Sequence, residues 1–255
     1  MVKKKDVLKE KVKQIDFDEI VTVKDLVEAY KDSSIQSRAL ATCAIAYEKA
    51  LKDPARPTVI LGLAGPLVAA GLRKVIADMI KHGMVDAIVT IGAIPYQDFY
   101  QARGYNHYKC SPRCDDLALR EVFVDRIYDT LVDEDKFRET DEVIGDIAGE
   151  LEPRGYSSRE FMKILGESID DEDSILYNAA KYGVPFIVPA LNDSSIGIGL
   201  TGLYYRRRKA DQPFMRTRNA LESTLLSGIR PPAGRMTYIF IGWRAFCLHG
   251  IASSI

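Results

Sequence analysis

Hydrophobic positions in this chain fall into a few short continuous runs, separated by longer stretches with helical spacing. Three runs predict buried strands, because each is brief, rich in β-branched residues and bounded by Gly, Pro or charged positions. They are TVILGL at 58–63, VDAIVTIG at 85–92 and VPFIVPAL at 184–191. Strands that are apolar along their whole length are typical of a parallel sheet that is covered on both faces.

Apolar residues at i, i+3 and i+4, together with cap signals, predict helices between and around these strands. The predicted helices are 36–52 after the Ser33-Ser34 signal, 64–83 ending on a glycine, 157–169 after a serine cap, and 174–183 with a glycine stop. Residues 58–92 then form one β–α–β unit. Strands that alternate with helices predict an α/β fold built on a doubly wound parallel sheet, with helices on both faces.

Elsewhere the pattern is weaker. Residues 93–145 are polar, aromatic and charged, and predict only a short strand at 126–132. Residues 236–243, MTYIFIGW, predict a strand with no covering helix after it. We therefore expect the C-terminal part of the fold to be incomplete or non-native.

Charge divides the chain more sharply than hydropathy does. Residues 206–255 contain nine Lys or Arg against two acidic residues, Asp211 and Glu222. The pattern indicates three parts: an N-terminal arm at 1–31 with a short amphipathic piece, an α/β domain at 32–210, and a divergent tail at 211–255. A basic, acid-poor tail of this kind is what translation out of frame would produce.

The overall composition excludes several classes of protein. The formal net charge of −1 and 47% hydrophobic residues describe an ordinary globular chain, with no reason to expect a nucleic-acid or membrane partner. No apolar run approaches the ~20 residues that span a bilayer. The N-terminus becomes charged instead of apolar, so we expect no secretory signal and a cytoplasmic location. Four cysteines are too few and too scattered for a disulfide scaffold.

Candidate binding residues lie where the predicted strands end. Ligands of open parallel sheets bind at the carboxyl ends of the strands, and three loops rich in small residues follow them: 63–71, 90–98 and 191–199. Small residues let a ligand approach the backbone, although none of the loops has the G-x-G-x-x-G spacing. Asp193 suits a ribose hydroxyl, or else it caps a helix that begins near Ser194. The residues alone leave both readings of Asp193 open.

The other polar clusters give weaker evidence for a functional site. His107, Cys110 and Cys114 lie close together in HYKCSPRC, but they fall short of a strong zinc pattern, and a loop with ordinary thiols is the simpler interpretation. We therefore predict no metal site. The sequence contains no G-x-S-x-G or H-E-x-x-H motif, and we assign no catalytic residue.

The order of the loops resembles deoxyhypusine synthase and its archaeal-type relatives. The resemblance rests on YKDSSIQSRAL, on the segment from ILGLAGPLVAAG to HGMVDAIVTIGA, on SSREFMKILGESI, and on YNAAKYGVPFIVPALNDSSIGIGL, which together cover roughly 28–205. It implies a Rossmann-like sheet in a homotetramer. It also implies NAD-dependent transfer of the aminobutyl group of spermidine, through an imine on a lysine, to a lysine of the hypusine-containing translation factor.

The same resemblance implies an NAD site. Its expected contacts are Gly65, Pro66 and Leu67 in the first loop, Gly92 and Ala93 in the second, and Asp193 in the third.

This sequence departs from the family at several functional positions. Gly65 and Pro66 stand where the family carries Ser and Asn. Tyr96 and Gln97 stand where it carries paired glutamates for the polyamine, and Ile198 where many members have an Asp. The segment with the imine-forming lysine has no counterpart after residue 210. The alternative expectation is therefore an inactive member, truncated or a pseudoenzyme, that binds NAD or assembles with an active paralogue as a hetero-oligomer.

Overall fold

The computed structural model describes residues 3–210, 216–218 and 236–241. Its contacts divide the chain into two compact units, 1–57 and 58–255. The domain limits expected from the sequence, at 31/32 and 210/211, stay predictions. Most of the expected tail, namely 211–215, 219–235 and 242–255, lies outside the described residues.

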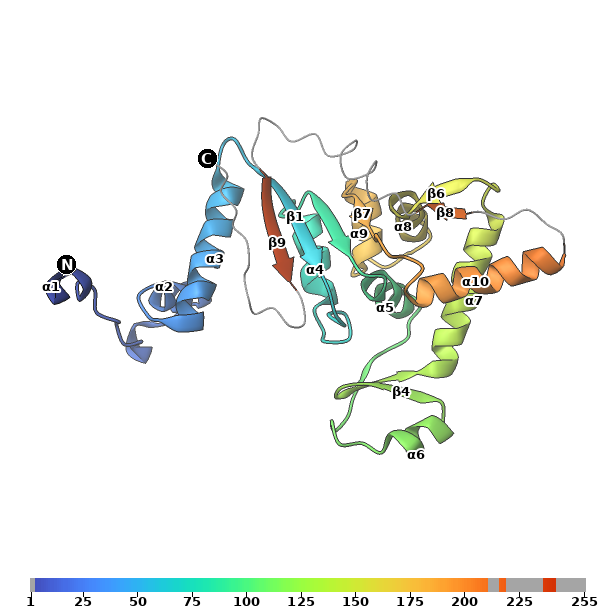
Figure 1. Cartoon of the computed structure of the whole chain (residues 1–255), viewed down its shortest axis with the longest axis horizontal. Coiled ribbons are helices and arrows are strands. Elements are labelled where there is room, and N and C mark those ends of the chain that lie inside the picture. Colours follow the sequence, from blue (N-terminus) through green and yellow to red (C-terminus); the bar gives the residue numbers. More distant parts are fainter. Residues whose placement is uncertain (1–2, 211–215, 219–235, 242–255) are drawn as a thin grey trace. The chain divides into compact units, whose positions relative to one another are not determined.

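The first unit is helical. Its two longer helices are α2 (Val23–Lys31) and α3 (Ile35–Lys52), which pack against each other (Figure 1). Thr22 and Asp25 cap α2 reciprocally: each side chain accepts a hydrogen bond from the backbone N–H of the other. Helix α3 confirms the helix predicted at 36–52. A short helix α1 (Lys4–Val7) and a 3₁₀ turn η1 (Phe17–Glu19) precede this pair.

A four-stranded parallel sheet organises the second unit. Its strands are β1 (Thr58–Leu63), β2 (Ala87–Thr90), β7 (Phe186–Ile187) and β9 (Met236–Ile241), in the order β7-β2-β1-β9 (Figure 1). All three pairings are parallel, and Leu63 lies opposite Thr90 on one side and Ile241 on the other. Every residue of β1 is buried, as its apolar sequence predicts. The α/β class with a parallel sheet is confirmed.

Between β1 and β2 the chain forms the expected crossover, but its helix is shorter than predicted. Helix α4 spans Arg73–Lys81, whereas residues 64–72 form a loop of turns. Gly65 and Gly71 have φ of 82° and 84°, which is left-handed and incompatible with a helix. The prediction of a helix from residue 64 was therefore wrong in its first half.

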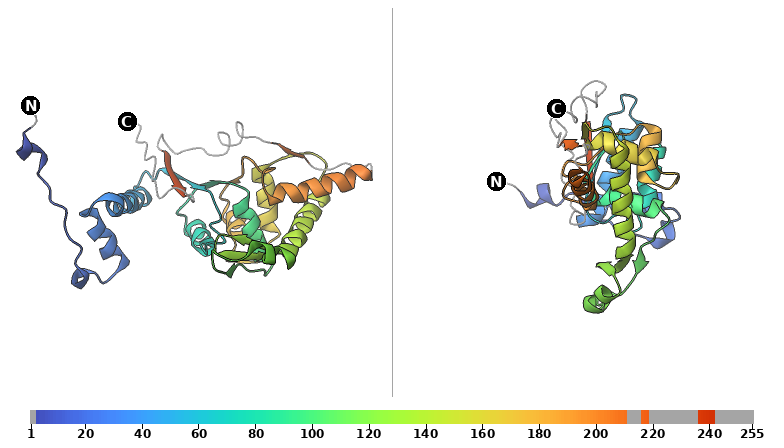
Figure 2. Two further views of the ribbon diagram at one scale, coloured as in Figure 1. Left: turned by 60° about the horizontal axis from the view of Figure 1, so that its bottom comes forward. Right: turned by 90° about the vertical axis from the view of Figure 1, so that its right-hand side faces the viewer.

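Local cap signals located the next two helices correctly. Helix α8 (Ser158–Glu167) starts at a capping box formed by Ser157 and Glu160. Helix α9 (Ile175–Tyr182) starts at Ser174 and ends on Gly183 in the left-handed conformation. Helix α9 packs against both α4 and α8 (Figure 2).

The weakly patterned stretch from 93 to 145 holds more structure than the sequence predicts. It contains α5 (Ala93–Ala102), most of α7 (Glu134–Glu150) and a hairpin where one strand was expected. The hairpin pairs β4 (Val124–Ile127) with β5 (Thr130–Asp133), with Tyr128 and Asp129 in its turn. Helix α7 was missed although Asp133 caps its start by accepting from Lys136 N–H; it packs against α10 (Ser195–Lys209), which is remote in sequence.

Small elements complete the fold. Strand β3 (Tyr108–Lys109) pairs with β5, and helix α6 (Asp116–Glu121) packs on β4. Strands β6 (Gly155–Ser157) and β8 (Arg216–Arg218) form a separate parallel pair. The strand expected at 236–243 is present as β9, and the one expected at 184–191 is reduced to the two residues of β7. Among the described residues, no helix is both long and apolar enough to cross a membrane.

Candidate functional site

The three loops expected to bind a ligand all lie beyond the carboxyl ends of parallel strands. Residues 64–72 follow β1, residues 91–92 follow β2, and residues 188–194 follow β7 (Figure 1). Across the sheet, the four strands are the third, second, first and fourth along the chain, so the direction of the strand order reverses between β1 and β9. In open α/β sheets such a reversal is where a crevice for nucleotides forms. The first loop therefore begins at the switch point of the sheet.

The first loop is held by its own backbone. Leu67 N–H donates to the Gly65 carbonyl at 3.0 Å, and Leu72 N–H donates to the Leu67 carbonyl at 3.0 Å. Leu67 is buried beneath the loop, while Gly65 and Pro66 are partly exposed at its start. Of the three residues predicted here, Gly65 and Pro66 offer surface to a ligand, and Leu67 supports them from below.

The second loop is two residues long, and the third lies directly on it. Gly92 precedes α5, which starts at Ala93. A Cβ atom on Gly92 would lie 2.3 Å from the Cβ and Oγ of Ser194. Only glycine permits this approach, so the structure brings Gly92 next to the residue that follows Asp193.

Asp193 lies six residues beyond β7, after a turn, and not at the strand end that the sequence suggested. Its side chain is exposed, and its carboxylate accepts no hydrogen bond from any residue in the described parts of the chain. The helix-capping interpretation is therefore not realised, although α10 begins two residues later. The turn is fixed instead by Asp193 N–H donating to the Ala190 carbonyl at 3.0 Å, and by Ser194 Oγ–H donating to the Leu191 carbonyl at 2.6 Å.

Tyr96 and Gln97, in the first turns of α5, point into the protein. Gln97 is 5% exposed, and its Oε1 accepts from Ala69 N–H at 3.1 Å, which ties the first loop to α5. Tyr96 is 2% exposed and donates its hydroxyl to the Phe137 carbonyl at 2.8 Å. Burial first, and then the Asp141 carboxylate, raise the pKa of Tyr96. Both side chains therefore serve the packing of the site and not its surface.

Asp98, the last residue of the predicted second loop, is fully buried. Its carboxylate accepts from Arg73 Nε at 2.7 Å, Ser174 Oγ at 2.8 Å, Ile175 N–H at 2.9 Å and Leu176 N–H at 2.8 Å. Arg73 also donates to Asp171 at 2.7 Å, and these two carboxylates raise the pKa of Arg73 against the opposing effect of burial. Sequence reasoning missed this cluster, whose one local signal is the serine cap of α9.

His107, Cys110 and Cys114 lie away from the three loops, around β3. The His107 side chain is partly buried, with Nδ1 2.8 Å from Gln101 Nε2, and burial lowers its pKa to about 4. Burial and then a hydrogen bond with Cys114 raise the pKa of the Cys110 thiol. Within the described residues, no three His, Cys, Asp or Glu side chains gather in a way that could hold a metal ion.

Comparison with known proteins agrees with this architecture. The family model described as deoxyhypusine synthase matches residues 25–223. The chain belongs to the deoxyhypusine synthase family. The family match begins near the start of α2 and ends beyond residue 210, so it includes all three candidate loops.

Among curated relatives of the deoxyhypusine synthase family, a deoxyhypusine synthase-like protein of Chlorobaculum parvum is 46% identical over 198 residues. That alignment covers 76% of this chain and 56% of the relative. A probable deoxyhypusine synthase 2 of Methanosarcina acetivorans is 42% identical over 184 residues, covering 71% of this chain and 53% of the relative. This chain thus spans about half the length of these curated relatives.

A solved structure supports the fold independently of sequence. A crystal structure from Entamoeba histolytica, assigned to deoxyhypusine synthase, superposes with a TM-score of 0.58 at 18% identity. The superposition covers 81% of this chain and 70% of the other. At that identity the likeness concerns the deoxyhypusine synthase fold alone.

Proposed function

We propose that this chain is the NAD-binding part of a deoxyhypusine synthase-type transferase. The observation that carries the proposal is the exposed, unengaged carboxylate of Asp193 beside Gly92, on the carboxyl edge of a parallel sheet. An acidic side chain at that edge is suited to accept hydrogen bonds from ribose hydroxyls. Gly65 and Pro66, at the switch point, offer a partly exposed turn to the remainder of the cofactor.

NAD would supply a hydride acceptor for an amine substrate, which in this family is spermidine. The reaction proposed is transfer of the aminobutyl group to a lysine of the hypusine-containing translation factor. The residues of this chain would bind and orient the cofactor. The three loops contain no lysine, so the amine that forms the imine would have to come from outside them.

NAD binding is tested first, by calorimetric titration of the full 255-residue chain. Asp193→Asn should weaken NAD binding about tenfold, because a charge-assisted hydrogen bond to ribose is lost. Asp170→Asn is the matched control, since Asp170 is also exposed but lies between α8 and α9. Absence of NAD binding, or equal affinities of the two variants, contradicts the assignment.

Turnover is tested separately, by following NADH formation from NAD with spermidine present. Spermidine-dependent NADH would support the transferase. NAD binding without NADH would direct attention to the alternative function.

The alternative is a catalytically inactive family member that binds NAD or assembles with an active paralogue. It is favoured by the burial of Tyr96 and Gln97, whose side-chain oxygens already form hydrogen bonds within the protein. Ile198, 63% exposed, adds no charge at its position. Co-purification of this chain with a full-length family member would support assembly, and a chain that stays alone in the presence of that member would contradict it.

A further inference from the structure

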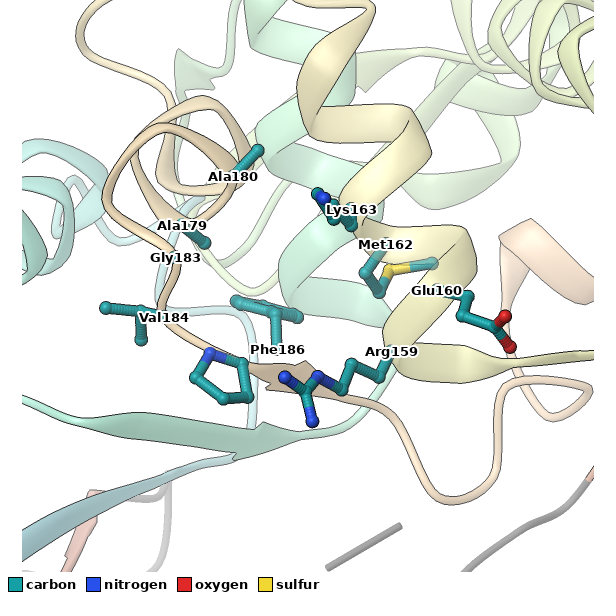
Figure 3. Close-up of a pocket in the computed structure, with 10 residues that line it drawn as sticks. Arg159, Glu160, Met162, Lys163, Ala179, Ala180, Gly183, Val184 and Phe186 are labelled. Carbon is teal, nitrogen blue, oxygen red and sulfur yellow. The ribbon is translucent and has the colours of Figure 1, made fainter. Parts of the chain in front are cut away.

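A cavity lies apart from the candidate NAD site, between α8, α9 and the segment at the start of β7 (Figure 3). Its volume is about 180 Å³. The apolar part of its wall comes from Met162 on α8, Ala179 on α9, and the run Val184, Pro185 and Phe186. The three loops of the candidate site follow the strands, whereas Val184 and Pro185 precede β7 and Phe186 is its first residue. The cavity is therefore a separate feature of the fold.

The charge of the cavity comes mainly from Arg159. Arg159 lines it from the first turn of α8 and reaches toward Val184 and Phe186 (Figure 3). Its side chain is partly buried and forms no hydrogen bond or ion pair with the described residues. A partly desolvated guanidinium without a partner is costly, and an anion beside it would remove that cost.

The other two charged residues of the lining are already engaged. Glu160 points away from Arg159 (Figure 3), accepts hydrogen bonds from Ser157, and pairs with Arg154 at 3.3 Å. Lys163 is mostly exposed and pairs with Glu167 at 3.5 Å. The lining thus combines an apolar wall with one positive charge that has no partner among the residues the structure describes.

We propose that this cavity binds a small organic anion, a carboxylate on a compact apolar body, with the carboxylate on Arg159 and the apolar body against Met162 and Phe186. The volume suits a single ring, since apolar cavities of about 150 Å³ admit benzene. The guanidinium supplies a planar fork of donors that matches a carboxylate. The site is independent of the NAD proposal, and it assigns this part of the molecule to a metabolite with one negative charge.

Benzoate is the probe, and isothermal titration of the full chain is the measurement. We expect a dissociation constant of about 1 mM or tighter for benzoate, given the size of the ligand. Benzamide, which has the same shape without the charge, should bind about tenfold more weakly. Added NAD should leave the benzoate affinity unchanged, so this test stands whatever NAD itself does.

Two variants locate the site. Arg159→Gln should weaken benzoate about tenfold, while Arg154→Gln, which removes a neighbouring charge from outside the lining, should leave it unchanged. Val184→Phe, which places a ring in the cavity, should weaken benzoate and benzamide alike. Thermal unfolding of each variant checks that it folds. If Arg159→Gln does not fold, Val184→Phe remains as the test.

The proposal is overturned by any of three results. These are no heat of binding up to about 10 mM benzoate, equal affinities for benzoate and benzamide, or benzoate affinity that neither Arg159→Gln nor Val184→Phe alters.

Discussion

Asp98 and Asp193 lie near the carboxyl edge of the same sheet, in two of the three loops singled out from the sequence, and the structure gives them opposite environments. Asp98 is fully buried and accepts hydrogen bonds from four groups, one of them a guanidinium. Asp193 is exposed and accepts none from the described residues. One carboxylate holds α4, α5 and α9 together, and the other is available to a ligand. Residue type and position on the sheet do not distinguish a structural aspartate from one that is exposed to solvent; the set of donors around the carboxylate does.

The sharpest test of this contrast removes each carboxylate in turn. Asp98→Ala should destabilise the protein by about 3–5 kcal/mol, because it leaves the buried charge of Arg73 and the start of α9 without their partner. Urea unfolding followed by circular dichroism measures the change. Asp193→Ala, the same deletion at the exposed site, is the control. A loss below about 1 kcal/mol for Asp98→Ala would mean that water replaces the carboxylate, and the contrast would fail.

The contact between the second and third loops is tested by adding one methyl group. Gly92→Ala should cost about 1–3 kcal/mol in unfolding free energy, because the new Cβ overlaps Ser194. The φ of Gly92 is −66°, so alanine suffers no backbone strain and the effect is steric. Gly92→Ala with Ser194→Gly should recover most of the loss. If the two substitutions simply add, the loops do not touch as described.

His107 extends the comparison to a polar group that is buried without full compensation. Its Nε2 has no hydrogen-bond partner among the described residues, and burial lowers its pKa from 6.5 to about 4. The unfolded chain therefore takes up a proton near pH 6.5, whereas the folded chain resists until about pH 4. The stability that His107 contributes is fully present above pH 6.5 and declines as the pH falls toward 4.

Urea unfolding of the parent and of His107→Gln, repeated between pH 7.5 and 4.5, isolates this contribution. We expect the parent to lose roughly 1–3 kcal/mol more than the variant over that interval, with part of the shift discounted because the ring is partly exposed. Parallel curves for the two proteins would show that the ring is solvated and protonates freely.

The smallest effect expected is itself informative. Asp193→Asn should change the free energy of unfolding by less than about 0.5 kcal/mol, because no hydrogen bond within the described residues depends on its carboxylate. Thermal unfolding without NAD measures this, and Asp170→Asn provides the baseline for an exposed aspartate. A larger loss would give Asp193 a structural role and weaken the case for a binding one.

The elements that the sequence predicted best have local signals, although the aspartate caps of α6 and α7 were overlooked. The limits of β1 were predicted to the residue, and α8 and α9 were found from Ser157, Ser174 and Gly183. Capping residues and apolar runs act within a few positions of themselves, so they can be recognised without the fold. The packing partner of helix α7, α10, follows 45 residues after its end, from Glu150 to Ser195, so this contact leaves no local pattern in the sequence. Helix α4 was predicted too long because apolar spacing does not reveal backbone conformation. The left-handed φ of Gly65 and Gly71, which keeps residues 64–72 out of the helix, is visible only in the structure.

The candidate site, too, has parts that the sequence predicted and parts that only the structure showed. Its three loops were predicted because the carboxyl ends of parallel strands must share one edge, and strands can be seen in sequence. The sequence alone thus predicted the family, the parallel sheet, and the three loops at the carboxyl edge of that sheet. Only the tertiary structure decided that Asp98, Tyr96 and Gln97 face inward, that Gly92 touches Ser194, and that Asp193 accepts no hydrogen bond from the described part of the chain. The physical reason is that hydrogen-bond partners and desolvation come from residues distant in sequence, and those meet only when the sheet and its helices have packed.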